Sequence, residues 1–266
     1  MSDTLLFEDK IVKFNNEVAP KYGWCVIYIG GPGSGKSTAT KFAVNLTGKT
    51  FDPDAFKHDK IVSLLKIDKN LVTPPSQRRL NNPDYVGELH NATEPIRQKA
   101  MQNQLTLGKN YPKDVLPNII FDIVGSTAKF NEIIPTVKDI GYKVAIVWVL
   151  TSVEKAYLQN SNRERKVADK VVLSGHQKVI DAVENLFASP MLHLIDEFWV
   201  IDNLNVATLN FDKTGKVTSD SAYAYQKDTN VYHITLKPNG LQEFKNLIAI
   251  IDNNKEFLAK QSTPTE

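Results

Sequence analysis

The chain has 266 residues, of which 42% are hydrophobic and 23% are charged. These values are ordinary for a globular protein, and they argue against fibrous, repeat and disulfide-scaffold classes. The 32 basic and 30 acidic side chains leave a net charge of +2. The overall charge therefore favours neither nucleic acid nor a membrane surface as the partner.

No segment signals secretion or membrane insertion. A single cysteine, Cys25, excludes an internal disulfide and indicates a reducing compartment. The N-terminus lacks the basic and apolar regions of a signal peptide. The longest clean apolar run, 144–150, is far shorter than the roughly 20 residues of a membrane helix. We therefore expect a cytoplasmic protein that does not contact the membrane.

Four apolar runs rich in β-branched and aromatic residues predict strands, at 24–29, 118–123, 143–150 and 198–201. Helix-like stretches separate these runs, and the runs are largely apolar instead of alternating with polar residues. Strands covered by helices on both faces have this composition. The pattern predicts an α/β fold: a three-layer sandwich with a mainly parallel sheet.

Cap signals mark the ends of three predicted helices. A helix over 36–46 is expected to stop at Gly48, and a helix over 130–140, with Pro135 in its first turn, is expected to stop at Gly141. The segment 151–154, Thr-Ser-Val-Glu, has the spacing of a capping box, which predicts that a third helix begins there.

A polar region at 70–110, with several prolines and arginines, interrupts the alternation of strand and helix. We expect it to form a loop-and-helix insertion. Pro95 is expected near the start of a helical stretch that runs to Gly108.

The last part of the chain has a different pattern. Residues 207–236 alternate between polar and apolar around a turn near Gly215, which predicts a β-hairpin. We expect one domain over 1–251, followed by a polar tail over 252–266 that begins as a fraying helix.

The most informative segment is 30–38, Gly-Gly-Pro-Gly-Ser-Gly-Lys-Ser-Thr, which matches the phosphate-binding pattern G-x-x-x-x-G-K-[ST] in full. It lies between a predicted strand and a predicted helix, as the mechanism requires. Glycines let backbone N–H groups curl around an anion, Lys36 can reach the β- and γ-phosphates, and Ser37 can coordinate Mg²⁺. The predicted nucleotide-binding residues of this loop are Gly31, Pro32, Gly33, Ser34, Gly35, Lys36, Ser37 and Thr38.

Two carboxylates follow the first predicted helix, in Asp52-Pro53-Asp54. In a parallel sheet this segment starts at the carboxyl edge beside the phosphate-binding loop, where ligands bind. A kinase needs a carboxylate there to accept the proton of the acceptor hydroxyl, and Asp54 is the candidate base. The alternative is that both aspartates cap the next helix.

Another carboxylate, Asp122, closes the predicted strand at 118–123. An aspartate in this place commonly holds Mg²⁺ or contacts the acceptor. The residues that follow, Gly125-Ser126-Thr127, offer hydroxyls and amides to a second anion. The alternative is a surface aspartate followed by an ordinary turn.

Cations follow the third predicted helix, in 162–166, within a lid expected at about 159–176. On a helix Arg163 and Arg165 point about 200° apart, so both can serve one phosphate only if the helix ends there. Arg163 is the candidate clamp on the transferring phosphoryl group, and a solvated run of charges is the alternative. Asn203, after the last predicted strand, is expected to border the nucleotide base.

In combination these motifs resemble the zeta-toxin family of P-loop kinases. The likeness covers about residues 20–205 and runs in order through the phosphate-binding loop, 51–57, Thr93-Glu94, 118–122, 141–143, Tyr157-Leu158 and 200–203. It implies phosphoryl transfer from ATP or GTP, with Mg²⁺, to a hydroxyl group. Lys36 would contact the nucleotide phosphates, Asp54 would be the base, and Arg163 would contact the γ-phosphate.

The resemblance also implies an acceptor and a partner. In toxin members the acceptor is the 3′-hydroxyl of UDP-N-acetylglucosamine, and an inhibitory antitoxin-like protein would restrain the enzyme. The acceptor contacts would come from Lys57, Glu94, Asp122 and Thr127. The cations nearest to the place of a second lid arginine are Arg165 and Lys170. Where the family usually has glutamate-glycine-threonine, this chain has Asp-Ile-Val-Gly-Ser-Thr at 122–127.

Two other functions stay open at this point. In the first, the acceptor is a nucleic acid, a nucleoside or a modified DNA base, and Arg78, Arg79, Arg97 and the lid cations line its groove. In the second, the chain is a nucleotide-dependent binding module without an acceptor. The sequence does not distinguish ATP from GTP as the donor.

Overall fold

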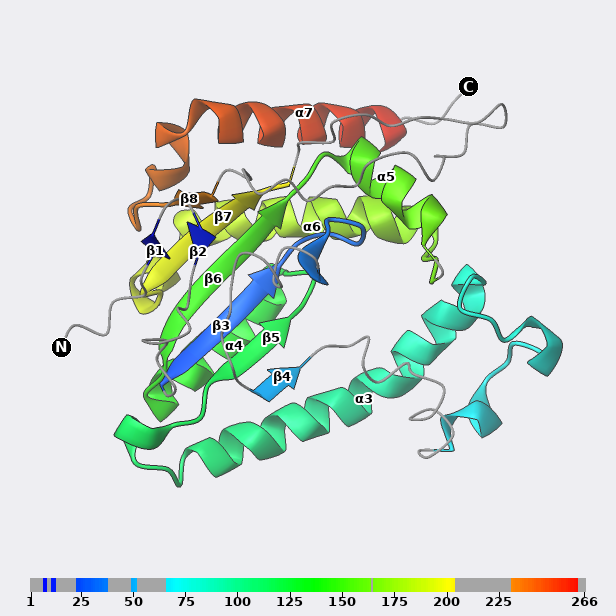
Figure 1. Ribbon diagram of the computed structural model, residues 1–266, viewed down its shortest axis with the longest axis horizontal. Helices are drawn as coiled ribbons and strands as arrows, with labels where there is room; N and C mark the ends of the chain where they lie inside the picture. Colours follow the sequence, from blue (N-terminus) through cyan, green and yellow to red (C-terminus); the bar gives the residue numbers. More distant parts are fainter. Residues whose placement is uncertain are drawn as a thin grey trace.

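The centre of the computed structural model is a six-stranded sheet with the order β4-β5-β3-β6-β7-β8 (Figure 1). In that order the strands are Lys49–Phe51, Ile119–Asp122, Trp24–Ile29, Lys143–Leu150, Glu197–Asp202 and Val231–His233. The pairs are parallel except that β8 is antiparallel to β7. A separate antiparallel pair is formed by β1 (Phe7–Glu8) and β2 (Ile11–Val12). The structure describes residues 7–8, 11–12, 23–37, 49–51, 66–163, 165–203 and 231–262.

The predicted strands are confirmed, and their apolar composition follows from burial on both faces. β3 lies between β5 and β6, so that Ile27 is paired with Phe121 on one side and Ile146 on the other. Because side chains alternate along a strand, its residues belong to two separate cores. Cys25, Ile27 and Ile29 face one core, and Trp24, Val26 and Tyr28 face the other.

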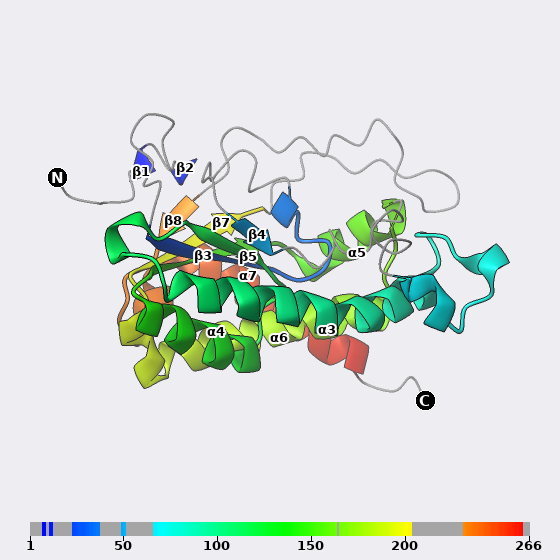
Figure 2. The same ribbon diagram turned by 90° about the horizontal axis from the view of Figure 1, so that it is seen from below.

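The larger core joins one face of the sheet to four helices, which Figure 2 shows on the same side. These are α3 (Pro83–Gly108), α4 (Thr127–Ile140), α6 (Asp169–Phe187) and α7 (Lys245–Ser262). A fifth helix, α5 (Val153–Asn162), follows the carboxyl end of β6. Short 3₁₀ helices lie at Ile67–Asn70, Pro75–Gln77, Lys113–Val115, Pro190–Leu194 and Gly240–Glu243. The α/β class with a mainly parallel sheet is confirmed, while most of the helix predicted at 36–46 lies outside the described residues.

The insertion contains one long helix that begins earlier than predicted. α3 starts at Pro83, and the Asn82 side chain caps it by accepting a hydrogen bond from the backbone N–H of Asp84 (3.1 Å). Pro95 lies in the helix interior and not near its start. A proline there removes one backbone hydrogen bond, and the carbonyl that loses its donor belongs to Asn91, which is exposed and can be hydrated. The helix therefore continues through Pro95 to Gly108.

α4 differs from its prediction in the same way. Its cap is Ser126, which accepts a hydrogen bond from the backbone N–H of Lys129 (3.3 Å), and Pro135 lies well inside the helix and not in its first turn. The predicted end is confirmed, because Gly141 takes the left-handed conformation at φ +112° that favours glycine.

The capping box predicted for α5 is wrong by one residue. Ser152 is the cap and accepts a hydrogen bond from the backbone N–H of Lys155 (3.1 Å). The Thr151 hydroxyl instead donates to the backbone carbonyl of Asn203 (3.2 Å). The hydroxyl expected to cap the helix thus links β6 to β7 at the edge where ligands are expected.

The C-terminal segment is more regular than predicted. α7 continues to Ser262 and buries Asn254 and Leu258, where a polar tail from residue 252 was expected. The buried residues of α7 recur at helical spacing. The prediction of a tail was based on the polar composition of the segment and did not take this spacing into account. Of the predicted hairpin, Val231–His233 forms β8, while 207–230 lies outside the described residues. Among the described helices, none has the length and apolar character needed to cross a membrane.

Candidate active site

The phosphate-binding loop leaves the carboxyl end of the central strand β3 in a conformation that requires glycine. Gly33 and Gly35 have φ angles of +81° and +85°, in the left-handed region. The backbone N–H of Gly30 donates to the carbonyl of Val124 (3.0 Å), which ties the loop to the segment after β5. The loop therefore begins beside Asp122, at the same edge of the sheet.

Neighbouring elements approach the loop so closely that side chains would not fit. A Cβ atom on Gly31 would lie 2.3 Å from the ring of His176, and one on Gly35 would lie 2.4 Å from the Asn203 amide nitrogen. A Cβ atom on Gly33 would lie 2.5 Å from the Ala156 carbonyl oxygen. The loop is thus packed against α6, against the residue that follows β7, and against α5.

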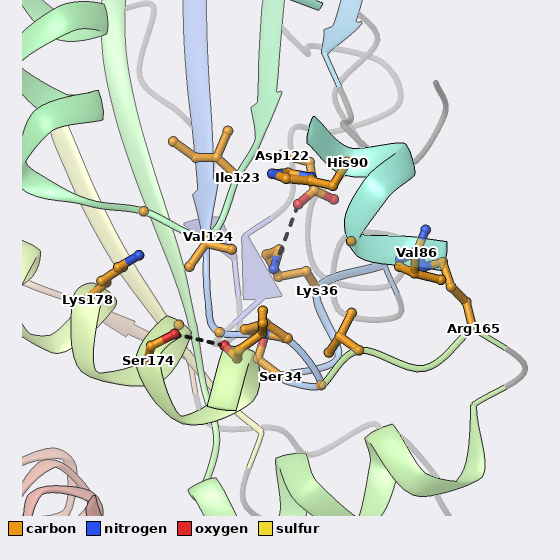
Figure 3. Close-up of a pocket in the computed structure, with 18 of the residues that line it drawn as sticks. Ser34, Lys36, Val86, His90, Asp122, Ile123, Val124, Arg165, Ser174 and Lys178 are labelled. Carbon is orange, nitrogen blue, oxygen red and sulfur yellow. Dashed lines mark hydrogen bonds and ion pairs between the residues drawn. The ribbon is translucent and has the colours of Figure 1, made fainter. Parts of the chain in front are cut away.

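Lys36 and Asp122 form the charged centre of the site (Figure 3). The Lys36 ammonium donates to the Gly30 carbonyl (2.7 Å) and lies 3.9 Å from Asp122 Oδ1. Both side chains are mostly buried, with exposed fractions of 15% and 19%. An ammonium at the loop, with a carboxylate beside it, is the arrangement that phosphoryl transfer needs for binding phosphate and metal together.

The oxygen donors beside the loop fit Mg²⁺. This ion prefers oxygen ligands and is usually held by one or two carboxylates together with substrate phosphates. The Asp122 carboxylate and the Ser37 hydroxyl both line the same cavity. Among the described residues, no cluster of three or more His, Cys, Asp or Glu side chains could hold a metal by itself. The buried Ser34 hydroxyl, which has no hydrogen-bond partner within the described part of the chain, is a further oxygen in the loop.

A cavity of about 590 Å³ extends from the loop toward α3. Figure 3 shows Lys36 directed toward Asp122, with His90 of α3 on one side and Lys178 of α6 on the other. Besides the loop, the cavity is lined by the first half of α3, the segment between β5 and α4, and α6, together with Arg163, Arg165, Val167 and Ala168 between α5 and α6. The cationic side chains that line it are Lys36, Arg97, Lys129, Arg163, Arg165 and Lys178. The cavity therefore suits an anionic ligand longer than a single phosphate.

Glu94, predicted as an acceptor contact, lines the cavity inside a network of hydrogen bonds. Arg97 donates to both of its carboxylate oxygens, and Gln98 donates to one of them (3.0 Å). Burial raises the pKa of the Glu94 carboxyl, but the hydrogen bonds and charge of Arg97, with Gln98 and Lys129, outweigh this and hold the pKa below its usual range. Glu94 is therefore an ionised hydrogen-bond acceptor at neutral pH.

The predicted lid arginines both line the cavity, because the helix ends before them. α5 stops at Asn162, and Arg163 has an extended backbone. The loop is anchored by Asn160, whose side chain donates to the Val167 carbonyl (2.8 Å) and accepts from the Val167 N–H (3.1 Å). Because the helix ends before Arg163, the two arginines are not directed to opposite sides of a helix, and both can contact the same ligand.

Other predicted residues lie elsewhere or cannot be placed. Thr127 is not among the residues that line the cavity, and its hydroxyl accepts a hydrogen bond from Asn185 of α6 (3.2 Å). Asn203 also lies outside the lining, and its side chain donates to the Ser34 carbonyl (2.7 Å). Thr38, Asp54 and Lys57 lie outside the described residues.

The cations proposed for a nucleic-acid groove are brought together only in part, since Arg97, Arg163 and Arg165 line the cavity. Arg97 is buried and paired with Glu94. Arg78 donates to the carbonyls of Thr73 (2.8 Å) and Leu71 (3.2 Å), and neither Arg78 nor Arg79 lines the cavity.

Sequence reasoning missed several residues of the site. His90, Lys129, Ser174 and Lys178 line the cavity, and their helical elements carry no local motif. His176 of α6 contacts the Pro32 carbonyl of the loop. Lys155 of α5 contacts Asn203, whose side chain in turn contacts the loop. Two sequence features could have indicated these elements: the place of Lys129 three residues after Ser126, and the start of α6 directly after the lid.

His176 lies beneath the loop, where its Nε2–H donates to the Pro32 carbonyl (3.1 Å). Burial lowers the pKa of His176 to about 4, the hydrogen bond to Pro32 opposes this, and the charge of Lys36 adds to the lowering. The unfolded chain binds the same proton at a pKa of about 6.5. The free energy of unfolding should therefore fall as the pH drops from about 6.5 toward 4, because only the unfolded state gains the proton.

We expect the His176 contribution to reach about 2 kcal/mol between pH 7 and pH 5. Urea unfolding of wild type and of His176→Gln at both pH values measures it, since glutamine does not titrate. His193, which is exposed, provides the control variant His193→Gln. Equal pH dependence in all three proteins would contradict the prediction.

No family model matches the chain. No curated protein sequence matches it either. Among solved structures, the chain is similar to one from the PezAT chromosomal toxin–antitoxin system of Streptococcus pneumoniae, with a TM-score of 0.44, 14% identity, and coverage of 90% of this chain and 88% of that chain. It is also similar to the AvrRxo1-ORF1:ORF2 complex with ATP, with a TM-score of 0.48, 14% identity, and coverage of 92% and 78%.

The same complex with sulphate ions gives a TM-score of 0.44, 17% identity, and coverage of 90% and 74%. At this level of similarity the likeness does not extend to substrates or to individual catalytic residues.

Proposed function

We propose that the chain is a P-loop phosphotransferase that moves the γ-phosphoryl group of ATP or GTP to a hydroxyl group of an acceptor. The observation that carries this proposal is the cavity itself. It joins the phosphate-binding loop and the Lys36–Asp122 pair to a polar wall on α3, beneath a loop that supplies Arg163 and Arg165. A nucleotide-binding module without an acceptor does not need the α3 wall.

The reaction assigns a role to each part of the site. The acceptor oxygen attacks the γ-phosphorus, the bond from that phosphorus to the β–γ bridging oxygen breaks, and the acceptor proton passes to Asp54. Backbone N–H groups of the loop and Lys36 bind the phosphates, and Arg163 neutralises the charge that develops. Mg²⁺ would be held by Ser37 and Asp122 and would neutralise phosphate charge.

Asp54 as the base is supported by the topology around it. β4 ends at Phe51, which is paired with Phe121, the residue before Asp122. The chain therefore leaves β4 at the carboxyl edge of the sheet, on the side of Lys36 and Asp122.

For the acceptor we propose a small anionic molecule, a sugar nucleotide such as UDP-N-acetylglucosamine. The cations Lys129, Arg165 and Lys178 suit its phosphates, and the ionised Glu94 can accept hydrogen bonds from sugar hydroxyls. Lys57 and Thr127 are carried over from the family resemblance alone. An inhibitory antitoxin-like protein is proposed as the partner on the same ground.

The test is transfer of labelled γ-phosphate from ATP or GTP with Mg²⁺, with UDP-N-acetylglucosamine, a DNA oligonucleotide and an RNA oligonucleotide offered in parallel. Lys36→Ala and Asp54→Asn are the site variants, and Asp252→Asn, on the exposed side of α7, is the matched control. We expect label on the sugar nucleotide from wild type and from the control, and none from the site variants. Label on an oligonucleotide would overturn the acceptor, and release of free phosphate unaffected by Asp54→Asn would overturn the transfer reaction.

A further inference from the structure

A lysine with no place in the reaction lies behind the phosphate-binding loop. Lys155, in the first turn of α5, is only 6% exposed and does not line the cavity. Its ammonium donates to the Asn203 side-chain oxygen Oδ1 (3.2 Å) and to the Asn203 backbone carbonyl. Asn203 follows β7 and is further fixed by hydrogen bonds with the Leu150 carbonyl (2.8 Å) and the Thr151 hydroxyl (3.2 Å).

The lysine determines which way the Asn203 amide points. An ammonium only donates hydrogen bonds, so the amide atom beside it must be the oxygen. The Nδ2 group is therefore turned to the opposite side, where it donates to the Ser34 carbonyl (2.7 Å). In the reversed orientation two carbonyl-type oxygens would face each other across that distance.

The Ser34 carbonyl lies in the middle of the phosphate-binding loop. The contact is tight, because a Cβ atom on Gly35 would lie 2.4 Å from Asn203 Nδ2. A carbonyl held on the outer side of the loop leaves the neighbouring N–H groups free to point inward at phosphate. The amide of Asn203 therefore supports the anion-binding conformation of the loop.

A buried ammonium is expensive to maintain for packing alone. Burial lowers the pKa of Lys155 to about 8, and the charge of Asp202 on β7 opposes this lowering. An apolar side chain of the same length would avoid the cost of desolvation. A positive group at this place therefore indicates a function beyond filling space.

We propose that Lys155 is a positioning residue of the nucleotide site, which orients the Asn203 amide and through it the Ser34 carbonyl of the phosphate-binding loop. The inference rests on the proposed function only in that the loop binds a nucleotide. It does not depend on the identity of the acceptor.

The test measures ATP affinity by calorimetry, with thermal unfolding alongside. Lys155→Met keeps the length of the side chain and removes the donor, and Asn203→Asp places a carboxylate oxygen against the Ser34 carbonyl. Each change should weaken ATP binding about tenfold or more, as expected when a charge-assisted hydrogen bond is lost. The unfolding temperature of Lys155→Met should change little, because the desolvation cost that methionine avoids offsets the loss of the two hydrogen bonds to Asn203.

Two readouts separate positioning from a merely structural role. The rate of transfer with saturating ATP should stay within about threefold of wild type in Lys155→Met, while the KM for ATP rises, because the reacting groups are intact. Lys155→Arg keeps a permanent charge, so its ATP affinity should not change between pH 7 and pH 9.5. The wild-type affinity should fall over that range as Lys155 loses its proton, with Asp202 the charged neighbour among the described residues.

The outcomes also distinguish this inference from the proposed function. A wild-type protein that binds no nucleotide would overturn both. If wild type, Lys155→Met and Asn203→Asp bind ATP within about twofold of each other, the positioning role is overturned and the proposed function stands. A loss of affinity matched by a large fall in the unfolding temperature of both variants would assign Lys155 to folding and would also overturn the role.

Discussion

Replacing Lys36 with alanine is expected to lower the rate of phosphoryl transfer about 10³-fold at saturating nucleotide. The ammonium lies 2.7 Å from the Gly30 carbonyl and 3.9 Å from the Asp122 carboxylate, poised at the end of the loop. It is mostly shielded from water, so its charge is weakly screened. Charge that develops on the phosphoryl oxygens would lose one of the protein cations that neutralise it.

Steady-state kinetics with labelled ATP measures this effect. Lys36→Arg keeps the charge but changes its shape and should recover only part of the rate. Lys260 of α7 pairs with Glu256 on an exposed surface, so Lys260→Ala is the control for removing a lysine as such. A Lys36→Ala protein that keeps more than about one tenth of the wild-type rate would contradict the role given to Lys36 in the transfer step.

The sheet could be predicted from the sequence because its signals are local. The run 143–150 matches β6 at both ends, and 24–29 matches β3. Continuous apolar composition was sufficient, since these strands are buried on both faces. The starts of two helices were predicted wrongly because the prediction relied on prolines. Pro95 and Pro135 are strong local signals, but caps at Asn82 and Ser126 and packing against the sheet determine where α3 and α4 begin.

The site could be predicted only where a motif carries the chemistry. The loop at 30–38 and Asp122 follow from spacing and position, and the structure brings Lys36 and Asp122 together. His176 is remote from the loop in sequence, and a lone histidine or lysine on a helix has no local signature. Their contacts with the loop depend on how α5 and α6 pack, which is a property of the tertiary structure.

Asn203 shows most clearly which part of a residue's role can be predicted from the sequence and which part cannot. Its place after the last parallel strand pointed to the ligand edge, and the structure puts it there. A place beside the nucleotide base stays a prediction, whereas the observed contact of the Asn203 side chain is with the Ser34 carbonyl. Position along the sheet was readable from the sequence, but the direction of the side chain was set by Lys155.

Replacing Gly33 with alanine is expected to weaken ATP binding about 100-fold without removing any chemical group. Gly33 has a φ of +81°, and a Cβ atom there would lie 2.5 Å from the Ala156 carbonyl oxygen. That carbonyl belongs to the backbone of α5 and cannot move aside as a flexible side chain can. The loop would have to shift away from α5, and its N–H groups would no longer converge on one phosphate.

Gly23 supplies a matched control, because its φ is +86° and no described atom lies within 4 Å of the place that a Cβ atom would take there. Gly23→Ala carries the cost of the left-handed backbone, about 1 kcal/mol, without the clash. Calorimetric titration with ATP and urea unfolding of both variants separate the two effects. We expect both variants to lose similar stability, while only Gly33→Ala loses ATP affinity. That result would assign the loss of ATP affinity to the shape of the loop. Normal ATP binding by Gly33→Ala would mean that the close approach of α5 does not fix the loop in the conformation that binds phosphate.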